Sequence, residues 1–97
     1  MNRLKLTDKQ RSLIRMCRAA YRRRMADIDA QLILDQVKIQ NELEKENPDV
    51  DRLEMLCNKI GYWQGEKLRE KIATDLTLER KILTPQQLQK FREIQEK

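Results

Sequence analysis

Apolar residues recur at intervals of three and four along two long parts of the chain, and this spacing predicts amphipathic α-helices. The first apolar stripe begins at Leu13 and ends at Leu43. The second begins at Leu53 and ends at Ile82, and a shorter third stripe follows from Leu88. No apolar run approaches the roughly 18–20 residues that a membrane-spanning helix needs. The pattern therefore predicts an all-α chain with two long helices and one short one.

Proline and capping residues set the expected helix boundaries. The first long stripe is uninterrupted until Asn47-Pro48, and a helix usually ends before a proline. The side chain of Asp49 can then cap the next helix. Two long helices joined by a short turn form an antiparallel hairpin, so we expect a hooked hairpin in which the last helix folds back. The expected helices span about residues 7–46, 49–82 and 85–96, in a single domain over residues 1–97.

A hairpin of two helices is too thin to bury all of its apolar residues. Leu13 and Ile14 point in different directions on a helix, and so do Ile33, Leu34 and Val37. Some apolar surface must therefore face outward. We expect it to support either a homodimer along a helix or a surface that binds another molecule.

The pattern Leu-Thr-x-x-Gln occurs twice, directly before the first and the last expected helix. In each copy the threonine can accept a hydrogen bond from the amide three residues on, and the glutamine can reach back to the threonine amide. In the second copy Pro85 takes the first helical position, where its missing N–H costs nothing. Two copies in one helical chain are far more specific than one capping box. The motif residues are Leu6, Thr7 and Gln10 in the first copy and Leu83, Thr84 and Gln87 in the second.

These motifs, the long basic helix, the Asn47-Pro48-Asp49 break and the closing helix make the chain resemble the LTxxQ periplasmic proteins of bacteria. That family includes the chaperone-like Spy and CpxP and the heavy-metal resistance and sensor proteins ZraP and CnrX. The resemblance covers residues 6–94. It implies a dimeric hooked hairpin shaped like a shallow cradle, with the two motifs brought together.

The resemblance also implies a periplasmic location. Residues 1–24 are basic and broken by charges throughout, so they show no signal peptide. We expect that a removed signal preceded the chain. A native Met1 would instead indicate a cytoplasmic protein and would weaken the resemblance.

The net charge of +5 is unevenly distributed. Residues 1–24 carry nine Lys or Arg against one Asp, for a net +8, whereas residues 25–54 carry three against nine, for a net −6. Four arginines of the basic part follow i, i+4, i+7 and i+11, which places them in one stripe on the first helix. Their stems can pack on apolar groups while the charged heads stay in water. The expected client-binding residues are Arg11, Arg15, Arg18, Arg22, Tyr21 and Trp63.

Other interpretations of the basic stripe stay open. A solvated helix face is the simplest alternative. Nucleic-acid binding is disfavoured because only Tyr21 joins the arginines and no recognition motif is present. Gly61 and Gly65 flank Tyr62-Trp63-Gln64 inside the second helix. They predict a close helix approach or a bend there, and favour an interface or cradle floor over a ligand site.

The two cysteines are not expected to form a disulfide within one chain. In a hairpin that turns near residue 47, Cys17 lies opposite roughly residue 78, about 30 Å along the helix from Cys57. A disulfide requires Cα atoms within about 7 Å. Both cysteines are therefore expected to be free and packed, or to pair between chains.

Catalysis and metal binding find little support in the residue types. The chain has no histidine, no glycine-rich phosphate loop and no nucleophile with a plausible base, so it is not expected to be an enzyme. Asp75 and Glu79 form an i, i+4 carboxylate pair at the place where metal-sensing relatives carry ligands, and they are weak candidates for a cation site. No cofactor is expected.

Three functional hypotheses follow from the sequence. The first is an ATP-independent periplasmic chaperone that binds unfolded or misfolded proteins in envelope stress. The second, with the same fold, is a heavy-metal resistance or sensor protein that regulates a sensor kinase or another signalling partner. The third is a cytoplasmic helical adaptor or nucleic-acid binder.

Overall fold

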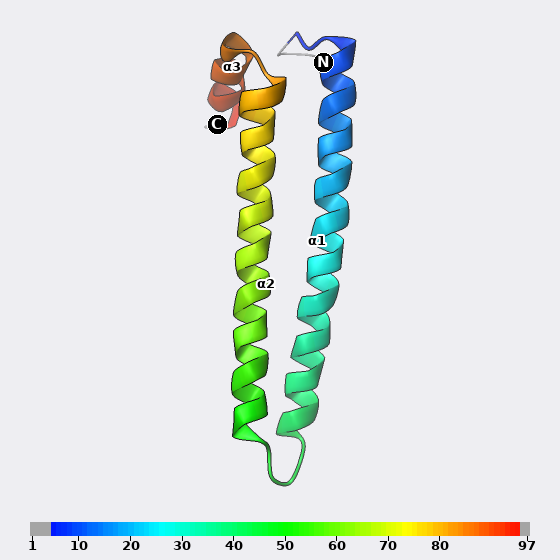
Figure 1. Cartoon of the computed structure of the whole chain (residues 1–97), viewed down its shortest axis with the longest axis vertical. Coiled ribbons are helices and arrows are strands. Elements are labelled where there is room, and N and C mark those ends of the chain that lie inside the picture. Colours follow the sequence, from blue (N-terminus) through cyan, green and yellow to red (C-terminus); the bar gives the residue numbers. More distant parts are fainter. Residues whose placement is uncertain (1–4, 96–97) are drawn as a thin grey trace. The chain divides into compact units, whose positions relative to one another are not determined.

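The structure is a computed structural model that describes residues 5–95, with the side chain of residue 95 excluded. All regular structure in this part of the chain is helical (Figure 1). The prediction of two long helices and a short C-terminal helix is confirmed. The elements are α1 (Asp8–Leu43), α2 (Val50–Thr77), a wide π-helical turn η1 (Leu78–Ile82) and α3 (Pro85–Gln95). None of the helices in the described part is long and apolar enough to cross a membrane.

The turn between α1 and α2 begins earlier than expected. α1 ends at Leu43, three residues before the predicted boundary. The backbone tightens there into a 3₁₀-type turn, because the Lys45 N–H donates to the Glu42 carbonyl, three residues back. Asp49 caps α2 as predicted: its Oδ1 accepts from the Arg52 N–H at 3.2 Å.

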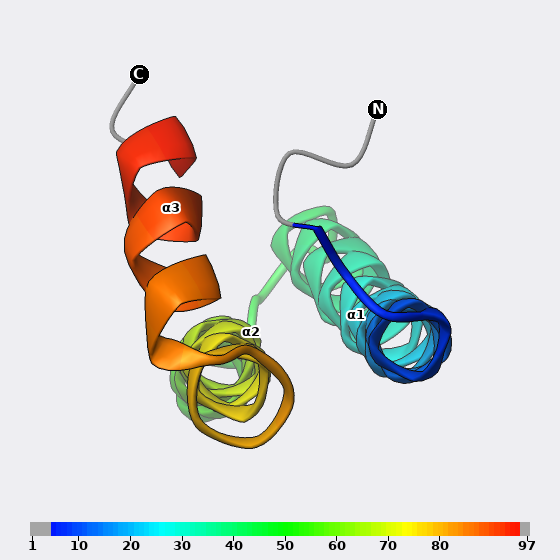
Figure 2. The ribbon, with the colours of Figure 1, turned by 90° about the horizontal axis from the view of Figure 1, so that it is seen from above.

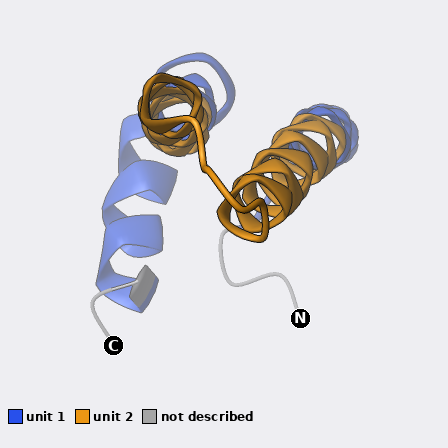
Figure 3. Cartoon of the chain, turned by 90° about the horizontal axis from the view of Figure 1, so that it is seen from below, with its two compact units in different colours: residues 1–22, 71–97 blue, residues 23–70 orange. Residues whose placement is uncertain are grey.

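Contacts divide the chain into two compact units, which Figure 3 distinguishes by colour. Unit 1 comprises Met1–Arg22 and Lys71–Lys97, and unit 2 comprises Arg23–Glu70. α1 and α2 each contribute to both units. The units are described separately below.

Unit 2 is a helical hairpin in which the second part of α1 runs antiparallel to the first part of α2 (Figure 3). Ile28 of α1 and Leu56 of α2 are its fully buried apolar residues. The ion pair between Asp29 and Lys67, 2.9 Å from Oδ1 to Nζ, lies on the hairpin surface and links the two helices. Arg24 adds a second link, through Glu66 and Glu70 of α2.

Glu42 holds the turn of the hairpin together. Its side chain is only 2% exposed, and its carboxylate accepts from the Asp49 N–H at 3.2 Å. It also pairs with Lys45 Nζ at 3.1 Å and Arg52 Nε at 3.2 Å. The backbone hydrogen bond from Asp49, followed by the Lys45 hydrogen bond, lowers the pKa of Glu42 below its ordinary value.

Asp35 occupies a buried position of unit 2 where an apolar residue would be expected. Its side chain is 0% exposed, and it lies seven residues after Ile28 on the same face of α1. Lys59 Nζ approaches Asp35 Oδ1 at 3.7 Å, but neither carboxylate oxygen accepts a hydrogen bond from the described residues. This buried carboxylate is thus poorly compensated, which is costly.

Unit 1 has a small core of its own. Ile14 of α1, Leu78 of η1 and Leu83 are buried together. Four half-buried residues pack against them: Leu6, Cys17, Ile82 and Phe91. Figure 2 shows that α3 turns away from the direction of α2 after this point. The first turns of α1, η1 and α3 are therefore joined by one apolar cluster.

The π-helical turn explains how Leu78 and Leu83 reach the same core. On an α-helix, side chains five positions apart point roughly 140° away from each other. In η1 the Leu83 N–H donates to the Leu78 carbonyl at 2.9 Å, an i→i+5 bond that widens the turn. Leu83 then leaves the helix with extended backbone angles. The wider turn lets both leucines face Ile14.

Candidate functional site: a glutamine joint and an arginine-rimmed pocket

Both LTxxQ motifs form the capping boxes that the sequence predicts. In the first, the Gln10 N–H donates to Thr7 Oγ1 and the Thr7 N–H donates to Gln10 Oε1, each at 3.0 Å. In the second, the Gln87 N–H donates to Thr84 Oγ1 at 3.2 Å and the Thr84 N–H donates to Gln87 Oε1 at 3.0 Å. Each glutamine is thereby fixed at the start of its helix.

The same two glutamine side chains also bind each other within unit 1. Gln10 Nε2 donates to Gln87 Oε1 at 2.8 Å, and Gln87 Nε2 donates to Gln10 Oε1 at 3.1 Å. Their remaining N–H groups reach carbonyls beside the opposite motif. Gln10 Nε2 donates to the Ile82 carbonyl at 2.8 Å, and Gln87 Nε2 donates to the Lys5 carbonyl at 3.4 Å.

This glutamine joint has an approximate local two-fold symmetry. Ile82 and Lys5 each lie two positions before the threonine of their own motif. The leucines of the two motifs share the symmetry, because Leu83 is buried in the core of unit 1 and Leu6 packs against that core. The Ile82 carbonyl lies at the end of η1, where helix carbonyls lack partners in the helix. The joint supplies the missing donor.

Lys5 is held in an unusual backbone conformation next to the joint. Its φ is 52°, in the left-handed region that non-glycine residues rarely adopt. Such a conformation persists only where surrounding contacts determine it. Here the Gln87 hydrogen bond to the Lys5 carbonyl provides one of those contacts.

A pocket of about 480 Å³ lies on unit 1, beside the first motif. Its apolar part comes from Leu6 and Ile14, and its charged rim from three arginines of α1 and one aspartate. The arginines and Ile14 follow i, i+3, i+4 and i+7, the spacing of one helix face. The lining residues are Leu6, Asp8, Arg11, Ile14, Arg15 and Arg18.

The charges around this pocket are only partly compensated. Arg11 Nη1 lies 4.0 Å from Asp8 Oδ1, and both side chains are at least half exposed. Arg15 and Arg18 are exposed and form no ion pair within residues 5–95. The pocket therefore combines an apolar floor with a positive rim. Such a site fits a ligand that carries an apolar group next to an anionic one.

Not every expected client-binding residue belongs to this pocket. Arg22 is exposed on α1 and Tyr21 is half-buried, and neither lines the pocket. Trp63 belongs to unit 2, where it is half-buried and in edge-to-face contact with exposed Tyr62, with ring centroids 5.1 Å apart. Its Nε1 has no hydrogen-bond partner among the described residues. Ile14, which the sequence analysis did not select, contributes to the floor.

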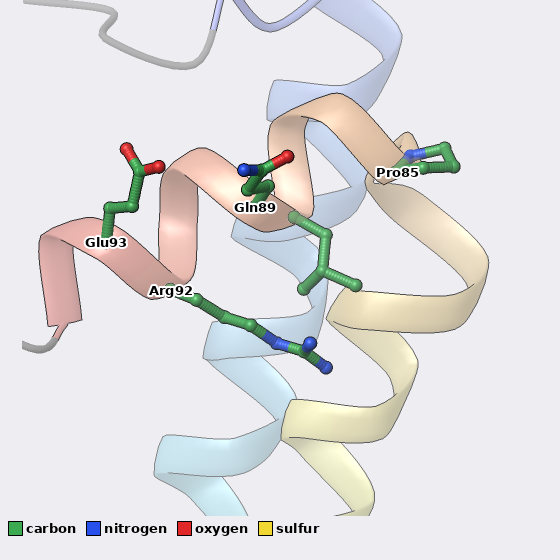
Figure 4. A pocket seen from close by; sticks show the side chains of 5 residues that line it. Pro85, Gln89, Arg92 and Glu93 are labelled. Carbon is green, nitrogen blue, oxygen red and sulfur yellow. The ribbon is translucent and has the colours of Figure 1, made fainter.

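A second pocket, of about 490 Å³, lies along α3 in unit 1 (Figure 4). It is lined by Pro85, Leu88, Gln89, Arg92 and Glu93. Figure 4 shows Arg92 and Glu93 extending to different sides of α3. Arg92 Nη2 lies 3.4 Å from Glu79 Oε2, so one of the two suggested metal ligands is engaged in an ion pair. Across residues 5–95, no three His, Cys, Asp or Glu side chains gather as a metal site.

The structure bears on the expectations about glycine and cysteine. A Cβ added at Gly61 would meet nothing within 4 Å, and at Gly65 only the flexible Arg69 side chain. Neither glycine therefore marks a close approach of another helix among the described residues, whereas the bend and the interface or cradle floor stay predictions. Both cysteines are free thiols. Cys17 packs against the unit 1 core, but Cys57 is exposed rather than buried.

Comparison of the chain with protein-family models, with curated proteins and with solved structures finds no match. The resemblance to the LTxxQ periplasmic proteins therefore stays a prediction from the motifs.

Proposed function

We propose that this protein is an ATP-independent chaperone of the LTxxQ periplasmic type, which binds non-native proteins in envelope stress. The observation that carries the proposal is the pocket in which Arg15 and Arg18, free of ion pairs in the described chain, border the apolar floor of Leu6 and Ile14. A client segment with an acidic residue beside a bulky apolar one would satisfy both parts of this surface.

The energetics favour weak and broad binding. Arginine heads that stay in water gain little from each pairing, and a shallow apolar floor buries only part of a client side chain. Long arginine stems adapt to clients of different shape. Binding should weaken as salt screens the exposed charges, over a Debye length of about 8 Å at physiological ionic strength.

We further propose that the protein is a dimeric hooked hairpin with a cradle-like binding surface. In it the LTxxQ residues have an architectural role, because the glutamine joint fastens α3 and the end of η1 to the start of α1. The pocket lies directly beside that joint. The proposed setting is the periplasm.

The test is suppression of aggregation of a reduced, unfolding protein, without ATP, at low and high salt. The Arg15→Glu/Arg18→Glu variant should lose most of the suppression. Lys81→Glu/Lys90→Glu is a matched control, because both lysines are exposed in unit 1 outside the pocket and the change in net charge is identical. Equal loss of suppression in both variants would show that suppression depends on net charge alone and not on the pocket. No suppression by the wild-type protein in stoichiometric excess would overturn the proposal.

A further inference from the structure

The arginine-rimmed pocket of unit 1 is in the size range of sites for small ligands. Its volume is about 480 Å³, within the range of pockets that bind small molecules in other proteins. Its arginines follow one face of α1 from Arg11 to Arg18, a length of about 10 Å along the helix. Their aliphatic stems can extend the apolar floor of Leu6 and Ile14 along that length. The pocket is therefore suited to a ligand with an extended apolar part.

The polar side chains that line this pocket are all charged. They are three guanidinium groups and one carboxylate, without a hydroxyl or an amide. A ligand with neutral polar groups along its length would find few partners among these side chains, and polar groups that lose water without a partner are costly. A hydrocarbon chain carries no such groups. The lining therefore favours an alkyl chain over an extended peptide segment, whose backbone carries a donor and an acceptor at nearly every residue.

The charges of the rim favour an anionic headgroup at one end of the pocket. Arg15 and Arg18 form no ion pair within residues 5–95. Asp8 precedes Arg18 by ten residues, which is about 15 Å along α1. Asp8 repels an anion, and Arg11 Nη1 already lies 4.0 Å from its Oδ1. A carboxylate or phosphate headgroup therefore pairs best with Arg15 and Arg18, and the chain then extends toward Leu6.

The surface of an anionic bilayer fits this part of α1 less well than a single amphiphile does. Met16 is 66% exposed and is the large apolar side chain that a bilayer would bury most readily here. It is two residues from both Ile14 and Arg18, so it points about 160° away from them around the helix. A flat lipid surface cannot contact Met16 and the pocket together. The pocket therefore matches one free molecule rather than the face of a bilayer.

We propose that this pocket binds a free single-chain amphiphile with an anionic headgroup, such as a fatty-acid anion or an alkyl phosphate. The chain lies over Leu6 and Ile14, and the headgroup pairs with Arg15 and Arg18. Because the same pocket is the surface proposed for clients, a bound amphiphile blocks client binding. This regulatory consequence rests on the proposed function, whereas the binding of the amphiphile does not.

The test is isothermal titration calorimetry of the full chain with decanoate, below the concentration at which decanoate forms micelles. We expect one site per chain, with a dissociation constant below about 1 mM. Decyl phosphate should bind at least as tightly as decanoate. Decyl maltoside has the same chain and an uncharged headgroup, so it should bind about 2- to 30-fold more weakly, the effect of two exposed ion pairs. Equal binding of decanoate and decyl maltoside would overturn the role of the arginines.

A series of carboxylates from hexanoate to dodecanoate measures the length of the apolar part of the pocket. Each methylene group that becomes buried should lower the dissociation constant by up to about fourfold. The affinity should level off once the chain is longer than the floor. A gain that continues unchanged through the whole series would indicate partition onto apolar side chains elsewhere on the helices, and would overturn the assignment to this pocket.

Three variants locate the site. Arg15→Glu/Arg18→Glu should lose decanoate binding and gain binding of decylammonium, because the sign of the rim is reversed. Lys81→Glu/Lys90→Glu has the same net charge and an unchanged pocket, so it should bind decanoate like the wild type. Leu6→Ala keeps every charge and should raise the dissociation constant of decanoate about fourfold or more. Circular dichroism checks that each variant keeps its helix content, and undiminished decanoate binding by the arginine variant would overturn the site.

The outcomes separate this inference from the proposed function. A wild-type chain that binds neither decanoate nor decyl phosphate up to about 1 mM would overturn the amphiphile site, and the aggregation assay would still decide the chaperone proposal. Adsorption to vesicles of anionic phospholipid without binding of either single-chain ligand would also overturn it, in favour of a membrane surface. Where both proposals hold, saturating decanoate should reduce the suppression of aggregation. Suppression that saturating decanoate leaves unchanged would overturn the block of client binding.

Discussion

Replacement of Asp35 by alanine is expected to stabilise unit 2, although it removes a charged side chain that has an ion-pair partner. Asp35 is fully buried on α1. Neither of its carboxylate oxygens accepts a hydrogen bond within residues 5–95. Its partner Lys59 is 45% exposed and lies 3.7 Å away. The wild-type fold therefore carries a desolvated charge with weak compensation.

The expected magnitude follows from three contributions. A buried polar group without a hydrogen bond costs about 1–3 kcal/mol, and alanine avoids that cost. Alanine also gains a few tenths of a kcal/mol or more in helix propensity over aspartate. Against these, the loss of an ion pair to a half-exposed lysine costs about 0–1 kcal/mol. The balance is a stabilisation of about 1–2 kcal/mol. For a chain of this size, each kcal/mol raises Tm by roughly 4–8 °C.

The assay is urea and thermal unfolding followed by circular dichroism at 222 nm. Protein concentration must be the same for all variants, because association changes apparent stability. Asp29→Ala provides the matched control. Asp29 is on the same helix and pairs with Lys67 at 2.9 Å, but its side chain is 50% exposed. Its replacement should change the free energy of unfolding by no more than about 1 kcal/mol.

A destabilisation of Asp35→Ala by more than about 1 kcal/mol would refute this reasoning. It would mean that the surroundings of Asp35 stabilise its carboxylate more than the contact with Lys59 indicates. Asp35→Asn separates the causes, because it keeps the shape and removes the charge. If the alanine variant is stabilised and the asparagine variant is not, the unsatisfied polar atoms carry the cost, rather than the charge.

Two further predictions concern the turn of unit 2 and the joint of unit 1. Because folding lowers the pKa of Glu42, its stabilising effect is present above the unfolded value of about 4.3 and is lost as pH falls through the folded value. The stability difference between wild type and Glu42→Gln should therefore shrink between about pH 5 and pH 3, and a constant difference in urea melts over that range would contradict it. Gln10→Ala and Gln87→Ala should each cost about 2–3 kcal/mol, since each amide makes several partly buried hydrogen bonds. The double variant should cost less than the sum by about 1 kcal/mol, and strict additivity would show that the two amides act independently.

The sequence predicted those parts of the fold that depend on local chemistry. The capping boxes and the Asp49 cap are hydrogen bonds between residues within one helical turn. The all-α content follows from apolar spacings of three and four residues, which are also local. The hydrogen bonds between Gln10 and Gln87 depend instead on where the chain returns after 77 residues. No local pattern specifies that a glutamine which already caps its own helix will also bind its counterpart.

The spacing of apolar residues failed mainly to predict which polar residues are buried. Asp35 and Glu42 continue the buried seven-residue series of Ile14 and Ile28, yet an apolar count passes over both. Glu42 is buried because two donors from the following turn and one from α2 surround its carboxylate. The joint burial of Leu78 and Leu83 was not predicted for a different reason, since their five-residue spacing matches a core only after the turn widens.

The pocket and the glutamine joint are physically coupled through Leu6. This residue is the leucine of the first motif, it packs against the unit 1 core, and it forms part of the pocket floor. Its position depends on Lys5 and Thr7 on either side. Lys5 has a left-handed backbone and a carbonyl bound by Gln87, and Thr7 is fixed by the capping box. The second motif therefore determines the shape of a pocket whose charged residues all come from the first helix. This coupling gives the repeated motif a role beyond helix capping, because an opened joint would remove half of the apolar floor while leaving every arginine in place.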